Sequence, residues 1–454
     1  MKKLELNREI LRLSLPSILA NVTVPILGMV DTAVAGHLAS PDIAAASYIG
    51  AISLGSMLFN LLYWNFGFLR TGTSGITAQA FGREDPHECV CIFIRSISLA
   101  AISAAAVLLL QWPFAKLTLM ITDASDQVEY LASRYFFIRI WAAPATISLM
   151  TFRGWFVGMQ DTVRSMWTDL IVNCVNIAAS LVLTFGIGGW DGMGFDGIAT
   201  GTVVAQYSGL LYCLLACCFR YGRKVFLKIG SEDLRSLYSG GEMKRFLSMN
   251  ADLFIRGIGF IGIYIGYTMI AATLGDLLLA CSSIMMQLMM FFSYFTDGFA
   301  YAGEALTGRF IGAGQKEDLR MTVKYIFIWS MSLAGIFMVI YYFFSTPMLR
   351  LMTSDSNVVE TCTHFLPWLI LMPPLGCAAF TYDGIYLGAT ASRPIRDTMI
   401  AAMAAFFAVW FAGHYLTGLY GYGELHLLFA AYFVHLVVRT VWLSICYKKN
   451  IIVK

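Results

Sequence analysis

One carboxylate stands inside the first long apolar stretch of the chain. Asp31 lies in the run LSLPSILANVTVPILGMVDTAVAGHL, from Leu13 to Leu38. As a helix of about 26 residues, this run is long enough to cross a bilayer. A charged side chain near the centre of a membrane helix costs about 3 kcal/mol on insertion scales, and such residues mark ion or substrate paths. Asp31 is therefore a candidate for ion or proton coupling, and a structural aspartate bonded to neighbouring helices is the alternative.

A proline precedes this carboxylate on the same expected helix. Pro25 has no N–H group, so the carbonyl of Asn21 loses its helical partner and we expect the helix to bend. An ionisable group beside a weakened backbone ladder suits a switch driven by protons or ions.

Polar residues recur on one face of the fifth apolar run. Asp169, Asn173, Asn176 and Ser180 follow at i, i+4, i+7 and i+11. At about 1.5 Å per residue, Asp31 and Ser180 each lie about 10 Å below the outer end of their helix. Hydrogen bonds that only hold helices together are the alternative for each asparagine. We predict an N-half site for cation or proton coupling made of Asp31, Asn173, Asn176, Ser180, Thr200 and Thr202.

The second half places its charges at another level. Arg256 and Asp297 each lie about twenty residues from the turn near Gly275, so an antiparallel hairpin brings them level about 30 Å from that turn. Asp252 and Arg256 are also i,i+4 partners. Because buried charges are best tolerated when paired, we interpret this cluster as a structural clamp. Its predicted members are Asn250, Asp252, Arg256, Asp297, Tyr301 and Glu304.

A soft apolar stretch from Met285 to Phe292 suits a surface that accepts varied apolar ligands, although a lipid-facing patch fits it equally well. The candidate residues for a substrate cavity are Met29, Tyr63, Arg70, Gln206, Met286 and Met289.

The composition defines the class of protein. Of 454 residues, 58% are hydrophobic and 13% are charged, whereas soluble domains carry about 25% charged residues. The ten cysteines form no C-x-x-C motif and read as small hydrophobes. We predict an all-α integral membrane protein with about twelve transmembrane helices. The expected spans are 10–38, 44–80, 89–112, 127–156, 163–187, 194–219, 246–274, 277–312, 320–344, 357–388, 396–416 and 425–446.

Basic residues alternate between the loops. They gather before the first span, in the central link and after the last span, while Lys116 and Arg350 are the exceptions on the other side. The positive-inside rule then places both termini in the cytoplasm. The first run is too long for a signal peptide, and similar runs follow it, so we read an uncleaved first span of a multi-pass membrane protein.

The chain divides into two similar halves. We expect an N-lobe at 1–220, a cytoplasmic linker at 221–245 and a C-lobe at 246–454. ITDASDQVEYLASRYFFIRIWAAPATISLMTFRGWFVG aligns with MTSDSNVVETCTHFLPWLILMPPLGCAAFTYDGIYLG, which matches Gly154 to Gly384 and Gly158 to Gly388. Both halves have the same orientation, and such parallel repeats mark one class of secondary transporter. A channel built from two similar halves is the alternative.

These features resemble the MATE family of multidrug and toxic compound extruders, in its DinF-like branch. The residues that carry the resemblance are GMVDTAVAGHL, YWNFGFLRTGTSGITAQAFG, FRGWFVGMQDT, GMGFDGIATGT, NADLFIR and DGFAYAGEAL. The resemblance implies two six-helix lobes in a V around a central cavity, with Asp31 at the carboxylate implicated in proton coupling. It implies a monomer that exports organic, cationic or amphipathic compounds through the bilayer, without cofactor or nucleic acid.

One substitution in the fifth span bears on the identity of the coupling ion. Some relatives carry a second carboxylate four residues after the asparagine that matches Asn176, and here that residue is Ser180. One carboxylate can still exchange a proton but is a poorer cage for Na⁺, so the resemblance implies H⁺ coupling with Na⁺ as the alternative. A lipid-linked sugar flippase would need a strongly basic cavity, and the interior basic residues are chiefly Arg70 and Arg256. An enzyme is disfavoured because the six histidines are scattered without a metal pair or nucleophile motif.

Overall fold

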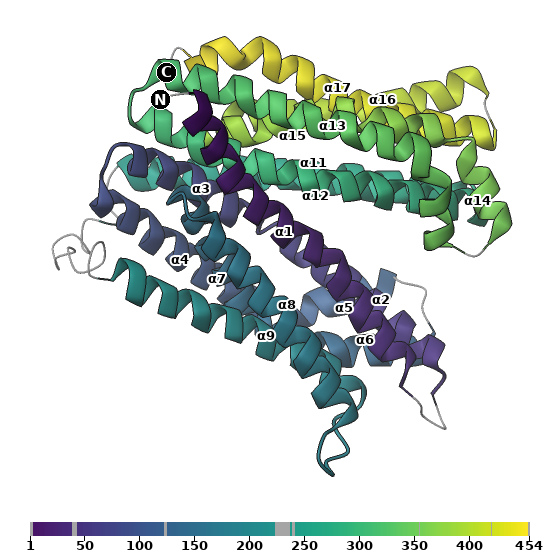
Figure 1. Cartoon of the computed structure of the whole chain (residues 1–454). Coiled ribbons are helices and arrows are strands. Elements are labelled where there is room, and N and C mark those ends of the chain that lie inside the picture. The colour runs from purple at the N-terminus through teal and green to yellow at the C-terminus, as the bar shows by residue number, and fades with distance from the viewer. Residues whose placement is uncertain are drawn as a thin grey trace. The chain divides into compact units, whose positions relative to one another are not determined.

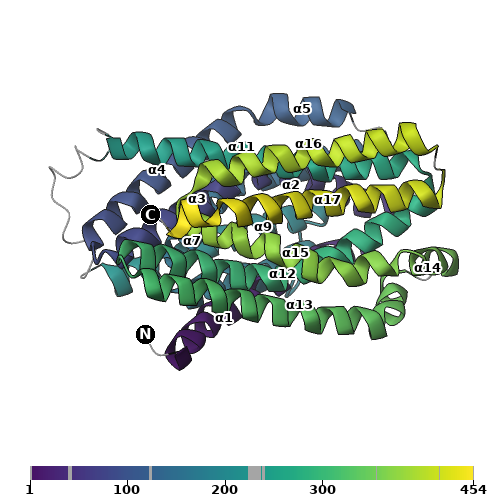
Figure 2. The same cartoon turned by 90° about the horizontal axis from the view of Figure 1, so that it is seen from above.

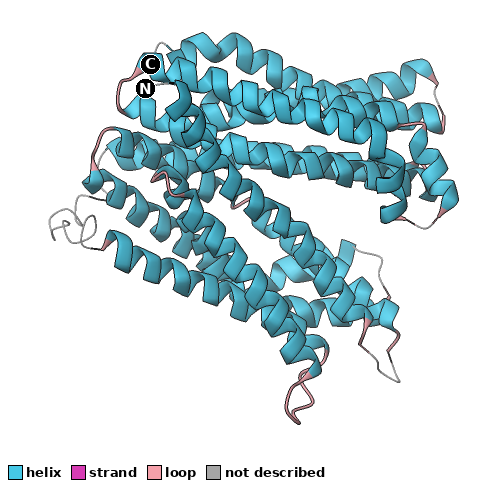
Figure 3. Cartoon of the chain, viewed as in Figure 1, coloured by secondary structure: helices cyan, strands magenta, loops and turns pink. Residues whose placement is uncertain are grey.

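The computed structural model describes residues 3–38, 43–121, 125–222, 237, 241–353, 355–418 and 420–452. Within these ranges the regular elements are helices, and a single β-bridge joins Ile187 to Trp190 (Figure 3). Most of the predicted linker, at 223–236 and 238–240, lies outside the described residues.

The predicted membrane fold is confirmed. Eleven described helices are long and apolar enough to span a membrane, and a bent pair brings the number to twelve. The pair joins Ser356–Thr363 to Leu366–Gly388 at an angle of 58°. Large apolar side chains such as Phe219 and Leu351 lie on the outer surface, as expected where lipid replaces water.

Contacts divide the chain into two units: Leu19–Phe246, and Met1–Ile18 with Leu247–Lys454. The described part of the first unit contains nine α-helices or parts of them, together with the start of the helix at Gly241–Thr273 (Figure 1). The nine α-helices are α1 (Lys3–Gly36), α2 (Ala45–Trp64), α3 (Gly67–Gly82), α4 (Pro86–Leu109), α5 (Gln111–Ile121), α6 (Asp126–Arg139), α7 (Ala143–Gly158), α8 (Thr162–Phe185) and α9 (Phe195–Ala216).

Within this unit an apolar core surrounds Phe59, Tyr135 and Phe136, all nearly inaccessible. The indole of the buried Trp155 donates to the Cys89 carbonyl at 2.9 Å, which ties α7 to α4. The short helix α5 was not among the predicted spans. α1 runs through Pro25 as one helix.

The second unit is built from seven further helices. They are α11 (Gly241–Thr273), α12 (Asp276–Gly312), α13 (Lys316–Met352), α14 (Ser356–Thr363), α15 (Leu366–Gly388), α16 (Ser392–Thr417) and α17 (Tyr422–Tyr447). α16 and α17 lie side by side in both views (Figures 1 and 2). Met286 and Met289 are buried in this unit's core with Phe292.

The unit boundaries fall inside α1 and α11. The first turns of α1 are bound to the C-terminal helices, since Arg309 lies 2.6 Å from Glu9 and the Trp329 indole donates to Asn7 at 2.9 Å. The start of α11 is bound to the other unit, because the buried Arg95 of α4 contacts Glu242 at 3.1 Å. Each of these two helices therefore contributes to both units.

Matching glycines show the internal repeat in three dimensions. A Cβ on Gly154 would lie 2.2 Å from the carbonyl oxygen of Arg70, and one on Gly384 would lie 2.1 Å from that of Ala300. Only glycine permits such close approach of helix backbones. The packing of α7 on α3 is thus repeated by α15 on α12. The pattern recurs four residues later, with Gly158 against Ser74 and Gly388 against Glu304.

Candidate functional site

Asp31 is held in a position where its charge is poorly solvated. Its exposed fraction is 6%, and its Oδ1 has no hydrogen-bond partner among the described residues. The positive charge that acts on it is the guanidinium of Arg139, at the end of α6. Tyr63 and Tyr135 lie in the same electrostatic neighbourhood. The sequence analysis did not predict Arg139.

Arg139 is fixed by its own surroundings. Its Nη1 donates to the Tyr135 hydroxyl at 2.6 Å, and its Cζ lies 4.7 Å from the centroid of the Phe59 ring. A cation over an aromatic face is stabilised by the ring quadrupole. Immediately after Arg139, a 3₁₀ turn at Ile140–Ala142 interrupts the span before α7 begins.

Three of the predicted N-half residues form one network between α8 and α9. Asn176 donates to the Thr202 hydroxyl at 3.0 Å, and Ser180 donates to the Asn176 side-chain oxygen at 3.4 Å. The two helices approach closely because a Cβ on Gly201 would lie 2.6 Å from the Ser180 nitrogen. The described hydrogen bonds of this network do not include Asp31.

The remaining two residues of that predicted set have other partners. Asn173 donates to the Thr23 hydroxyl at 2.7 Å and so joins α8 to α1 two turns before Asp31. Thr200 donates to the Asp196 carbonyl of its own helix at 2.9 Å. Asn173 thus supports the helix that carries the carboxylate.

A second charge cluster in the first unit links three helices. Arg153 of α7 lies 2.6 Å from Asp169 of α8, and the charge of Arg70 on α3 also acts on Asp169. Asp169 was predicted on the polar face of the fifth span, but its arginine partners were not.

The second unit contains a carboxylate shared by two arginines. Asp383 of α15 accepts from Arg256 at 2.6 Å and from Arg439 of α17, whose exposed fraction is 1%. Both guanidinium carbons lie over the Phe260 ring, at 4.7 and 4.8 Å from its centroid. Asp383 Oδ1 and Arg439 Nη1 have no partner among the described residues.

The pairing expected between Asp252 and Arg256 on α11 is replaced by pairs across helices. Asp252 lies 2.5 Å from Arg396 and accepts from the Ser392 hydroxyl at 2.7 Å. Its partners come from α16, because tertiary packing offers a closer cation than the neighbouring turn does. Of the other predicted members, Asn250 and Glu304 are buried, while Asp297 and Tyr301 also make interactions within the fold.

Comparison with known proteins decides the family. A model of the MatE family matches residues 16–182 and 254–412, which is most of the chain. The chain belongs to the MatE family.

Two comparisons extend this finding. This MatE protein is 32% identical over 396 residues to the DNA damage-inducible protein F of Escherichia coli strain K12, covering 87% of this chain and 83% of the relative. It is 22% identical to the probable multidrug resistance protein NorM of Photorhabdus laumondii, with 89% and 86% covered. Membership of the MatE family agrees with the prediction that this protein is not an enzyme.

The fold agrees with solved structures. One described as an outward-facing conformation of a multidrug resistance MATE family transporter of the MOP superfamily superposes with a TM-score of 0.84 at 17% identity, covering 99% of both chains. At this identity the match shows the fold alone.

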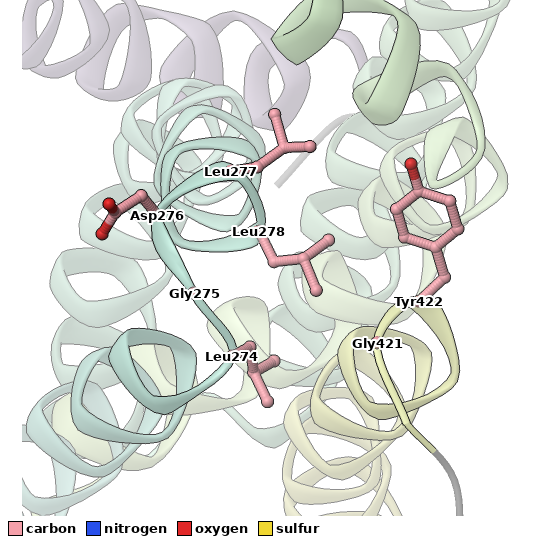
Figure 4. Close-up of a pocket in the computed structure, with 7 residues that line it drawn as sticks. All are labelled: Leu274, Gly275, Asp276, Leu277, Leu278, Gly421 and Tyr422. Carbon is pink, nitrogen blue, oxygen red and sulfur yellow. The ribbon is translucent and has the colours of Figure 1, made fainter.

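The candidate cavity residues of this MatE protein lie in different environments. Met29 is 65% exposed, Tyr63 and Gln206 are half-buried, and Met286 and Met289 are buried in the core of the second unit. Among the described residues, a pocket of about 450 Å³ lies between the start of α12 and the start of α17, and none of these candidate residues lines it (Figure 4). Leu274, Leu277, Leu278 and Tyr422 contribute side chains to its walls, and the side chain of Asp276 points away from it.

Features of the sequence could have identified several of the charged residues that form these contacts. Arg139 stands near the middle of the span 126–158, where an arginine is costly and needs a partner. Arg153 and Asp383 directly precede the matched glycines of the repeat. Their partners come from distant parts of the sequence and were not predictable from spacing.

Proposed function

We propose that this chain is a secondary active multidrug efflux antiporter. It exports organic, cationic or amphipathic compounds in exchange for protons by alternating access. Membership of the MatE family and the relative with a multidrug resistance name support export of drugs. The observation that carries the coupling mechanism is the buried Asp31 with an unpartnered Oδ1.

A proton is the simplest ligand for this carboxylate. Burial of a charged carboxylate without a contacting partner is unfavourable, and protonation removes the charge. Deprotonation restores a negative group that attracts a cationic substrate. In this scheme proton binding and substrate binding alternate at Asp31, which is the requirement for antiport.

Sodium coupling is the second candidate. A bound metal cation of this hard class needs several oxygen ligands. Three neutral side chains of the predicted site, those of Asn176, Ser180 and Thr202, already bond to one another. The proton therefore fits better, while a sodium ion would need this network to rearrange.

Flux measurements in proteoliposomes test the proposal. With the membrane potential held at zero, an outward flux of organic cations should follow an imposed pH gradient and ignore a sodium gradient. Asp31→Asn should abolish the gradient-driven flux while the protein stays folded. Asp191→Asn is the matched control, because Asp191 is exposed in the loop between α8 and α9. Flux that follows sodium alone overturns the proton assignment, and normal flux in Asp31→Asn overturns the role of Asp31.

We also propose that the protein is a monomer in the bacterial inner membrane with both termini in the cytoplasm. The bacterial relatives and the alternating basic loops support this orientation. Fusions of a cytoplasm-active and a periplasm-active reporter to the C-terminus test it, since only the first should be active.

A further inference from the structure

We propose that Arg139 is a positioning residue that sets how tightly Asp31 holds a cation, so that bound substrate can be released. This inference rests on the proposed function, because it assumes that Asp31 is the exchanging carboxylate.

The position of Arg139 requires an explanation. It lies within the membrane span Asp126–Gly158, near its middle, where an arginine is strongly disfavoured unless it has a role and a partner. Val30 and Val34, on either side of Asp31 in α1, pack in the same apolar cluster as Phe59 and Tyr135. Phe59 and Tyr135 are the two residues that hold Arg139, so the carboxylate of Asp31 is an opposing charge in its surroundings. The 3₁₀ turn that follows Arg139 breaks the regular ladder at this level, and such breaks mark hinges in helices.

Arg139 acts on Asp31 from a distance. No ion pair within 4 Å joins Asp31 to a described residue, so the carboxylate is not occupied by the guanidinium. The guanidinium is instead tethered by the Tyr135 hydroxyl at 2.6 Å and by the Phe59 ring. Tyr63 of α2 and Tyr135 of α6 are the other titratable groups of this neighbourhood. The positive charge of Arg139 therefore offsets only part of the cost of burying a charged carboxylate, and it does not occupy the carboxylate oxygens.

A fixed positive charge weakens the binding of any other cation to the same carboxylate. A guanidinium also offers only hydrogen-bond donors and cannot serve as a ligand to a metal ion. Removal of this charge should therefore tighten the binding of a cationic substrate and slow its release. We expect a change of about tenfold, which is the effect of two unit charges about 12 Å apart at an effective dielectric constant of about 20.

Two variants should shift binding in opposite directions. Arg139→Gln removes the charge, so the Kd and KM for tetraphenylphosphonium should fall about tenfold and kcat should fall with them. Tyr135→Phe removes the tether and lets the guanidinium approach Asp31, so the Kd should rise. Arg139→Lys should restore the KM and kcat toward wild type, because the charge is kept. The matched control is Arg134→Gln, an exposed arginine on the same helix that pairs with Asp196 at 2.6 Å.

Calorimetric binding to purified protein and flux in proteoliposomes provide the readouts. In an Asp31→Asn background, Arg139→Gln should have no further effect on the Kd. A wild-type Kd and kcat in folded Arg139→Gln overturn the inference and leave the proposed function intact. If Arg139→Gln does not fold, an unchanged or lowered Kd in Tyr135→Phe also overturns it. Normal flux in Asp31→Asn alone contradicts the proposed function instead.

Discussion

Arg153 and Asp383 occupy the same place in the two halves of the chain and carry opposite charges. Each directly precedes a glycine that packs against a helix backbone, Gly154 in α7 and Gly384 in α15. Arg153 contacts Asp169, while Asp383 is shared by two arginines. The repeat therefore preserves a position for an ion pair between helices but not its polarity.

Asp383 and its two partners, Arg256 and Arg439, form a cage of paired charges. We expect the Asp383 carboxylate to contribute more to stability than either arginine. Asp383→Asn leaves Arg256 and Arg439 buried without a negative partner, at a cost on the order of 3 kcal/mol. Arg256→Gln should cost less, because Arg439 still contacts Asp383. The thermal unfolding of both variants in detergent tests this order. Equal losses of stability would show that the three residues do not act as one cage.

The close contacts at the repeat glycines predict which glycine-to-alanine variants lose stability. Gly154→Ala and Gly384→Ala would each place a Cβ less than 2.5 Å from a backbone carbonyl, and overpacking of this kind costs roughly 1–3 kcal/mol. Gly335→Ala is the control, because a Cβ there meets nothing within 4 Å and alanine favours helices. Melting temperatures should fall for the first two variants and not for the third. A similar fall for all three would remove the argument from packing.

The variant Ser180→Asp tests which ion is coupled to transport, and it should also change the stability of the protein. A second carboxylate should increase the sensitivity of transport to sodium, since it adds oxygen ligands with negative charge. Ser180 is fully buried against Gly201, so the larger side chain should also lower the melting temperature. Sodium-dependent flux in liposomes and thermal unfolding are measured on the same preparation. Wild-type sodium response in a folded variant would place Ser180 away from the ion path.

We expect Arg95 of α4 to hold the start of α11 in place. Its Nε donates to the Leu237 carbonyl at 3.0 Å, and its other nitrogens contact Glu88 at 3.0 Å and Glu242 at 3.1 Å. Because Arg95 is buried, Arg95→Gln leaves Glu88 without its cation and should cost on the order of 3 kcal/mol. Limited trypsin digestion should then cut the basic segment between α9 and α11 faster.

The control for that experiment is Arg320→Gln. Arg320 pairs with Glu317 at 3.2 Å on an exposed helix face, where a salt bridge contributes only about 0–1 kcal/mol. Its digestion rate should equal that of the wild type. Equal rates for Arg95→Gln and Arg320→Gln would show that Arg95 does not hold the segment.

The sequence by itself determined the number of spans and the repeat, and it singled out Asp31 as a candidate for ion or proton coupling. Backbone groups must be satisfied within each helix in lipid, so long apolar runs define the spans without knowledge of the rest of the fold. The cost of a buried charge likewise marks Asp31 from its surroundings in the sequence. The matched glycines gave the register of the repeat, which the packing of α7 and α15 confirms.

Only the tertiary structure decided which charges meet. Asp252 and Arg256 lie one turn apart, yet their contacts are with Arg396 and Asp383, which come from other helices. The positive charge that acts on Asp31 belongs to Arg139, more than a hundred residues later in the chain, and the two side chains form no ion pair. Spacing along one helix fixes the face of a side chain but not which helix packs against that face. Partners of buried charges therefore depend on packing, which the residue pattern of a single span does not specify.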